Sequence, residues 1–178
     1  MIDANTLKQL QQMRESGYLS DAIMREAVKQ LKASDPRYNF VGVYLLNPGE
    51  DILWLHNYSG ESTDHVRIPI GSGVCGTAVA HKQNQNVPDV SKVENYLACS
   101  PRTKSELVVL IRQEDEIFGQ IDIDARELNA FAAPDQKLIE EMASLIANAI
   151  MREREEEEEL RRLHERNQEQ RQQEQQQA

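Results

Sequence analysis

Apolar positions recur along this chain with two different spacings, which separate predicted helices from predicted strands. A spacing of three and four residues covers 4–16 and 20–33, so we expect two amphipathic helices there, the second capped by Ser20. Apolar runs of strand length follow in 39–47 and 52–58, joined by the turn sequence NPGED. These two runs predict a β-hairpin.

The second half of the chain predicts more strands and a closing helix. Residues 66–70 form a short strand pattern, 71–83 a glycine-marked turn running into a small-residue helix, and 85–90 a short extended piece. Residues 106–125 read as two strands around the turn QEDE, and 134–150 carry helical apolar spacing. The order predicts an α+β fold with a central antiparallel sheet and helices on one side of it.

Composition divides the chain into a globular domain, 1–150, and a charged tail, 151–178. The tail has almost no apolar residues and carries nine acidic against six basic residues, so we expect a solvated helical extension that frays into a partly disordered Gln-rich end. The whole chain has a formal net charge of −10, which argues against a nucleic-acid partner. No run is apolar enough for a membrane span or a signal peptide, which predicts a cytoplasmic protein.

The two cysteines occupy different surroundings. Cys99 precedes the polar loop SPRTKSE and is therefore expected to be partly exposed. Cys75 lies between two glycines, Gly73 and Gly76, in GVCGTA. For Cys75, a small structural residue in a tight turn and a redox-active thiol both remain open. The chain has no Cys-x-x-Cys pair and its four histidines are scattered, so spacing predicts no metal site.

Two aspartates at alternate positions form the clearest candidate chemistry. Asp122 and Asp124 in QIDID project from one face of a predicted strand, and Glu106 heads the neighbouring strand. Such a cluster raises the pKa of at least one member, keeping a proton available near neutral pH, and it suits the ammonium group of an amino acid. The alternative is a solvated edge strand whose charges discourage aggregation.

Several strings in this order resemble the GAF domain, and within it the branch of free methionine-(R)-sulfoxide reductases. They are VRIPIGSGVCGTAVA, VPDV, LACSPRTKSELVV and GQIDIDA, with FVGVYLL matching more loosely upstream. Together they span residues 40–124, most of the predicted domain. The resemblance implies a GAF fold and reduction of free L-methionine (R)-S-oxide without a prosthetic group.

The resemblance also assigns roles to the candidate residues. It makes Cys99 the nucleophile, which becomes a sulfenic acid and then a disulfide that a thioredoxin-like partner reduces. It makes Glu106, Asp122 and Asp124 the substrate-binding and acid residues. Cys75 is one candidate for the thiol that resolves the sulfenic acid.

A substrate pocket is implied around these groups. Phe40, where the family often has tryptophan, and Tyr44 would form its apolar wall, although an aromatic residue in a strand equally suits an ordinary core. The glycine turn with Gly73, Val74 and Gly76 would offer backbone N–H groups to the substrate carboxylate. Family analogy further implies a homodimer through the terminal helices.

One departure from the family leaves the activity open. Members with three cysteines carry one just before VRIP, where this chain has His65. Cys75 or an external thiol would then have to resolve the sulfenic acid. The alternatives are a GAF module that binds a small ligand and a thiol-based redox sensor.

Overall fold

A six-stranded antiparallel sheet forms the centre of the computed structural model, which describes residues 4–97 and 100–176. The strands are ordered β3-β2-β1-β6-β5-β4. Their bounds are Tyr38–Leu46 (β1), Ile52–Gly60 (β2), Arg67–Pro69 (β3), Gln85–Val87 (β4), Ser105–Gln113 (β5) and Glu116–Ala125 (β6). The predicted strands, the β1–β2 hairpin and the antiparallel α+β class are confirmed.

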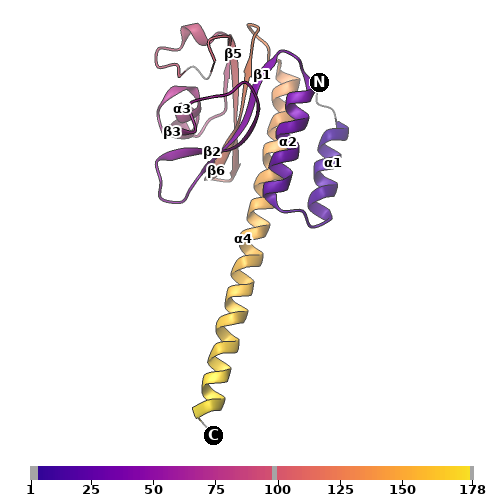
Figure 1. The fold of residues 1–178 in the computed structure, drawn as a ribbon, viewed down its shortest axis with the longest axis vertical. Helices are drawn as coiled ribbons and strands as arrows, with labels where there is room; N and C mark the ends of the chain where they lie inside the picture. Colours follow the sequence, from indigo (N-terminus) through magenta and orange to yellow (C-terminus); the bar gives the residue numbers. More distant parts are fainter. Residues whose placement is uncertain (1–3, 98–99, 177–178) are drawn as a thin grey trace.

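Helices lie on both faces of this sheet (Figure 1). They are α1 (Ala4–Glu15), α2 (Ser20–Ser34), α3 (Gly73–His81) and α4 (Ala133–Gln176), with a 3₁₀ turn η1 (Val90–Lys92). Helices α2 and α4 pack on one face with α1 outside them, and α3 packs on the other. The expectation of helices on one side only is therefore wrong.

The burial pattern explains the two layers. Side chains alternate across a strand, so β6 sends Ile121 and Ile123 toward α2 and α4, into a core that also holds Val41 and Val109. The alternate positions form a second core with α3. Both faces of β1, β5 and β6 are buried. A helix layer on one face alone would have left the side chains of the other face exposed to solvent.

Helix α4 continues far beyond the globular part (Figure 1). Its 44 residues correspond to about 66 Å of helix. From residue 155 to residue 173 the side chains are exposed, including Leu160 at 66%. The predicted helical extension is confirmed, and the helix persists to Gln176, further than the fraying expected from its composition.

None of the helices in the described ranges combines the length and the apolar character that a membrane crossing needs.

Candidate functional site

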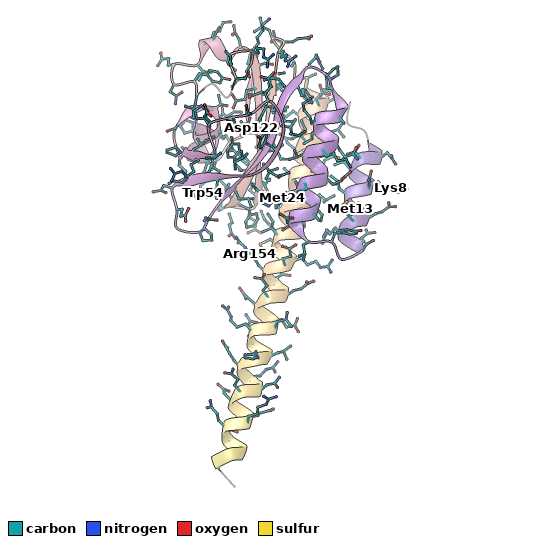
Figure 2. The ribbon with its side chains drawn as sticks, viewed as in Figure 1. Lys8, Met13, Met24, Trp54, Asp122 and Arg154 are labelled. Carbon is teal, nitrogen blue, oxygen red and sulfur yellow. The ribbon has the colours of Figure 1, made fainter. Side chains whose placement is uncertain are left out.

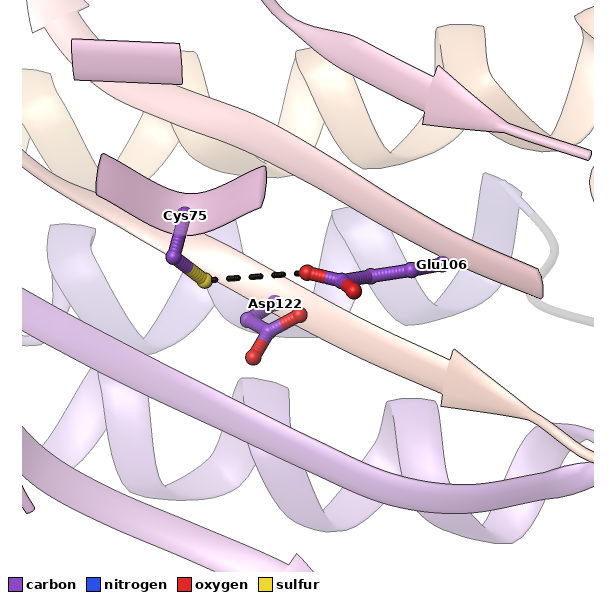
Figure 3. Close-up of side chains that lie close together, drawn as sticks. All are labelled: Cys75, Glu106 and Asp122. Atoms are coloured by element: carbon purple, nitrogen blue, oxygen red, sulfur yellow. Dashed lines mark hydrogen bonds between the residues drawn. The ribbon is translucent and has the colours of Figure 1, made fainter. Parts of the chain in front are cut away.

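A thiol and two carboxyl groups from three separate elements meet on the α3 side of the sheet (Figure 3). Cys75 comes from α3, Glu106 from the start of β5 and Asp122 from the middle of β6. One ligand atom from each lies within 4.8 Å of the others, and the Cys75 Sγ is 3.8 Å from the Glu106 Oε1. We call these three residues the thiol–carboxyl cluster.

Strand register places a third carboxyl group beside this cluster. Glu106 of β5 lies opposite Asp124 of β6, and Val108 lies opposite Asp122. Because side chains two residues apart share a face, Glu106, Asp122 and Asp124 all project toward α3, as the sequence predicted for the aspartate pair. We call these three residues the acidic cluster.

The acidic cluster is buried in the middle of the protein. Glu106 is 5% exposed, Asp122 0% and Asp124 1%. Strand β6 is flanked by β1 and β5, so the alternative of a solvated edge strand is wrong. Figure 2 shows Asp122 within the body of the sheet.

Burial dominates the electrostatics of the acidic cluster. Neither carboxyl oxygen of Asp122 or Asp124 has a hydrogen-bond partner among the described residues. Burial raises the pKa of Asp122 to about 7. Burial and then the charge of Asp122 hold the pKa values of Glu106 and Asp124 well above their ordinary range. The cluster therefore resists carrying three negative charges, and a cation or shared protons would stabilise it.

The two aromatic residues expected in the pocket share this face. Phe40 and Tyr44 of β1 are buried and belong to the second core with Cys75. Phe40 lies opposite Asp124 in the register, and its ring stacks on Tyr58 at a centroid distance of 5.6 Å. The Tyr44 hydroxyl donates to the backbone carbonyl of His65 at 3.0 Å, which fixes its polar end. Both rings are thus core residues beside the acidic cluster.

The glycine turn before α3 has the tight geometry that its sequence suggested, but one of its amides is engaged. The Gly76 N–H donates to the Ser72 carbonyl at 2.9 Å, so the expectation that Gly76 offers its amide to a substrate is wrong. A Cβ atom at Gly76 would approach the Pro69 carbonyl to 2.3 Å, which explains the glycine by packing. Gly73 has φ +61, a conformation that favours glycine, and the roles of Gly73 and Val74 toward a ligand stay predictions.

The predicted nucleophile, Cys99, lies outside the described residues, together with Ala98. The chain immediately after it is anchored. Glu61, just beyond β2, accepts a hydrogen bond from the Ser100 Oγ at 2.5 Å and forms ion pairs with Arg102 at 2.9 Å and Arg126 at 2.6 Å. The Ser100 hydrogen bond and Arg126 lower the pKa of Glu61 to about 2. These groups tie the loop that follows Cys99 to the ends of β2 and β6.

Glu61 and this anchor were not predicted from the sequence. Both arginines are visible as basic residues flanking the candidate motifs, but their partner is about 40 and 65 positions away. No local pattern joins residues so far apart. Another missed contact is the hydrogen bond from the Asn39 amide to the Thr103 hydroxyl at 3.1 Å, which ties the same loop to β1.

Comparisons with known proteins agree with this architecture. Residues 19–151 match the family model described as GAF domain. Protein YtsP of Bacillus subtilis is 34% identical over 144 residues, 81% of this chain and 88% of that protein. The free methionine-R-sulfoxide reductase of Escherichia coli is 31% identical over 136 residues, 76% of this chain and 79% of that enzyme.

A solved structure gives the same agreement. The fRMsr of Staphylococcus aureus in complex with substrate matches with a TM-score of 0.72 at 35% identity, covering 81% of this chain and 92% of that chain. The GAF match runs from α2 into α4, so it contains both clusters.

Proposed function

Because the chain belongs to the GAF-domain family of free methionine-R-sulfoxide reductases, we propose that it is an oxidoreductase that reduces free methionine (R)-sulfoxide to methionine. The observation that carries the proposal is the acidic cluster, three buried carboxyl groups beside a thiol with no cation paired to them among the described residues. Such a site suits a small cationic ligand that undergoes thiol chemistry. A relative solved in complex with substrate supports the same conclusion.

The acidic cluster would bind the ammonium group of the amino acid. A charged amine in a buried site needs opposite charge and hydrogen-bond acceptors, and Glu106, Asp122 and Asp124 supply both. Phe40 and Tyr44 would line the space for the apolar part of the substrate. The amides of Gly73 and Val74, at the start of α3, would face its carboxylate.

The first chemical step would be attack of the Cys99 thiolate on the sulfoxide sulfur. The sulfur–oxygen bond of the substrate breaks, its oxygen ends on the Cys99 sulfur as sulfenic acid, and methionine leaves. The oxygen must be protonated as it departs from the substrate. A carboxyl group of the acidic cluster would give that proton, and such general acids contribute about 10²- to 10⁴-fold in rate.

The second step would regenerate the thiol. The Cys75 sulfur attacks the sulfenic sulfur of Cys99, a disulfide forms and water leaves with the hydroxyl oxygen. A thioredoxin-like dithiol then reduces the disulfide. The position of Cys75 in the thiol–carboxyl cluster supports this role, because Glu106 lies within reach to accept the thiol proton.

The test is methionine release from the free R and S sulfoxide epimers, with dithiothreitol and with thioredoxin in parallel. We expect R-selective release with both reductants. Cys99→Ser should abolish release, whereas Cys75→Ser should lose it with thioredoxin and keep it with dithiothreitol, which reduces the sulfenic acid directly.

Other outcomes would contradict the proposal at separate points. Full activity of Cys99→Ser would overturn the nucleophile. Equal loss in Cys75→Ser with both reductants would overturn its resolving role. No release from either epimer by the unaltered protein would favour a ligand-binding or redox-sensing GAF module.

A further inference from the structure

We propose that the thiol–carboxyl cluster, Cys75, Glu106 and Asp122, is a zinc site, and that zinc held there excludes the substrate. Zinc binding stands on the geometry of these residues alone, whereas the exclusion of substrate rests on the function proposed above. Sequence spacing predicted no metal site because the three ligands come from α3, β5 and β6 and are 31 and 16 positions apart.

The distances suit a tetrahedral ion. With zinc–sulfur and zinc–oxygen bonds of about 2.3 Å and 2.1 Å, the edge of the tetrahedron between sulfur and oxygen is about 3.6 Å. The Cys75 Sγ and Glu106 Oε1 are 3.8 Å apart, and the ligand atoms of all three residues lie within 4.8 Å of one another. Figure 3 shows the thiol and the two carboxyl groups close together, so small side-chain rotations would bring the three ligand atoms to bonding distance of one ion.

A second observation points to a cation at this place. Asp122 is fully buried and neither of its oxygens has a hydrogen-bond partner among the described residues. A buried carboxylate without a partner is strongly unfavourable, and a divalent ion would compensate it. Asp124, two residues further along the same face, adds another buried carboxyl group to the negative field.

The types of ligand atom in the cluster favour zinc over magnesium and calcium. Magnesium and calcium prefer oxygen donors only, whereas one sulfur with two carboxylate oxygens is a set that zinc accepts. On binding, the Cys75 thiol loses its proton to solvent and coordinates as thiolate. Three protein ligands leave the fourth position for water, the coordination that catalytic rather than structural zinc sites have.

Zinc and substrate would compete for the same groups. The carboxylates that bind the ion would no longer be available to the substrate ammonium, and the Cys75 thiol would no longer be available to resolve a sulfenic acid. We therefore expect zinc to inhibit competitively with methionine sulfoxide.

The experiment uses cobalt(II) as a spectroscopic probe on the full-length, reduced protein. We expect a near-ultraviolet thiolate-to-cobalt band that zinc abolishes by displacement. Cys75→Ser should remove the band, and Asp122→Asn should weaken cobalt binding about tenfold or more, since even second-shell changes at metal sites cost that much. Cys99→Ser should keep the band, and thermal melting of each variant checks that it folds.

Each contrary result has a distinct meaning. A missing band, or a band that Cys75→Ser leaves unchanged, overturns the site. Equal loss in Cys99→Ser overturns the three-residue assignment. Should Cys75→Ser fail to fold, unchanged cobalt affinity in folded Asp122→Asn overturns the proposal. A zinc-sensitive cobalt band without inhibition of methionine release leaves the site in place and overturns the competition with substrate.

Discussion

The buried carboxyl groups of the acidic cluster lower the stability of the fold, so their presence is better explained by function than by folding. Asp122 is fully buried beside Glu106 and Cys75, and neither of its oxygens has a hydrogen-bond partner among the described residues, an arrangement that costs stability. Proteins retain such groups where a ligand compensates them. Activity and stability should therefore respond in opposite directions when this carboxyl group is removed.

Asp122→Asn tests that opposition. The amide has nearly the same shape but no charge, so we expect methionine release to fall about 100-fold or more while the melting temperature stays level or rises. Asp115→Asn, in the exposed turn between β5 and β6, is the matched control and should change neither quantity. A drop in melting temperature as large as that of a cavity-forming core variant would mean that Asp122 mainly supports the fold.

For single residues, the sequence correctly predicted which face of a strand a side chain lies on, but it did not predict whether that strand is buried in the middle of the sheet. Alternation within QIDID correctly placed Asp122 and Asp124 on one face, because that depends only on strand geometry. Whether the strand lies at the edge or in the centre depends on pairing with β1, more than 70 positions earlier in the chain, and with β5, across a turn. The contact between Cys75 and Glu106 likewise needs α3 to cross the sheet, which no local pattern specifies.

At the scale of the elements, the loop that follows Cys99 is held in place by Glu61, the residue just after β2. Glu61 joins Ser100, Arg102 and Arg126 at 2.5 to 2.9 Å. Ser100 is the next residue after the predicted nucleophile, so this anchor limits how far the loop can move. We therefore expect Glu61 to act as a positioning residue through the loop.

Glu61→Gln should slow methionine release several-fold. The loss should appear in kcat more than in KM, because the substrate-binding groups stay in place. Its effect on stability should depend on pH. The pKa of Glu61 falls from 4.5 to about 2 on folding, so its contribution is complete above about pH 4.5 and is lost as the pH falls toward 2.

Thermal unfolding of the two proteins from pH 7 to pH 3 measures that dependence. The difference between unaltered protein and Glu61→Gln should be largest at pH 7 and should shrink below pH 4.5. Glu94→Gln, at an exposed carboxylate shortly after η1, serves as control and should show no such trend. A difference that is independent of pH would contradict the ion-pair explanation.

For the whole molecule, the order of elements was predictable and the layering was not. Period and turn signals located the strands and the four helices to within a few residues. The second core, with α3 over Phe40 and Tyr44, arises because the chain crosses the sheet after β3. That crossing is a property of tertiary packing, since α3 alone has no apolar stripe that identifies which face it covers.

The boundary between the domain and its tail is also a property of the whole molecule. Composition put the boundary after residue 150, but contacts with the globular part continue a full turn further. Glu153 accepts from the Ser20 hydroxyl at 2.7 Å and from its backbone N–H, at the start of α2. Arg154 lies over the Phe118 ring at 4.7 Å and pairs with Glu116. Figure 2 shows Arg154 where α4 leaves the globular part.

Two truncations should therefore behave differently. A chain ending at residue 158 keeps these contacts, so its melting temperature and methionine release should match those of the full chain. A chain ending at residue 151 loses the Glu153 contact with α2 and the Arg154 contacts, and we expect about 1–2 kcal/mol less stability, as for a lost helix cap. Urea unfolding measures both. Equal stability of the two truncations would mean that these contacts contribute nothing, and a loss already present at residue 158 would contradict the expectation that the helix beyond it adds nothing to the stability of the domain.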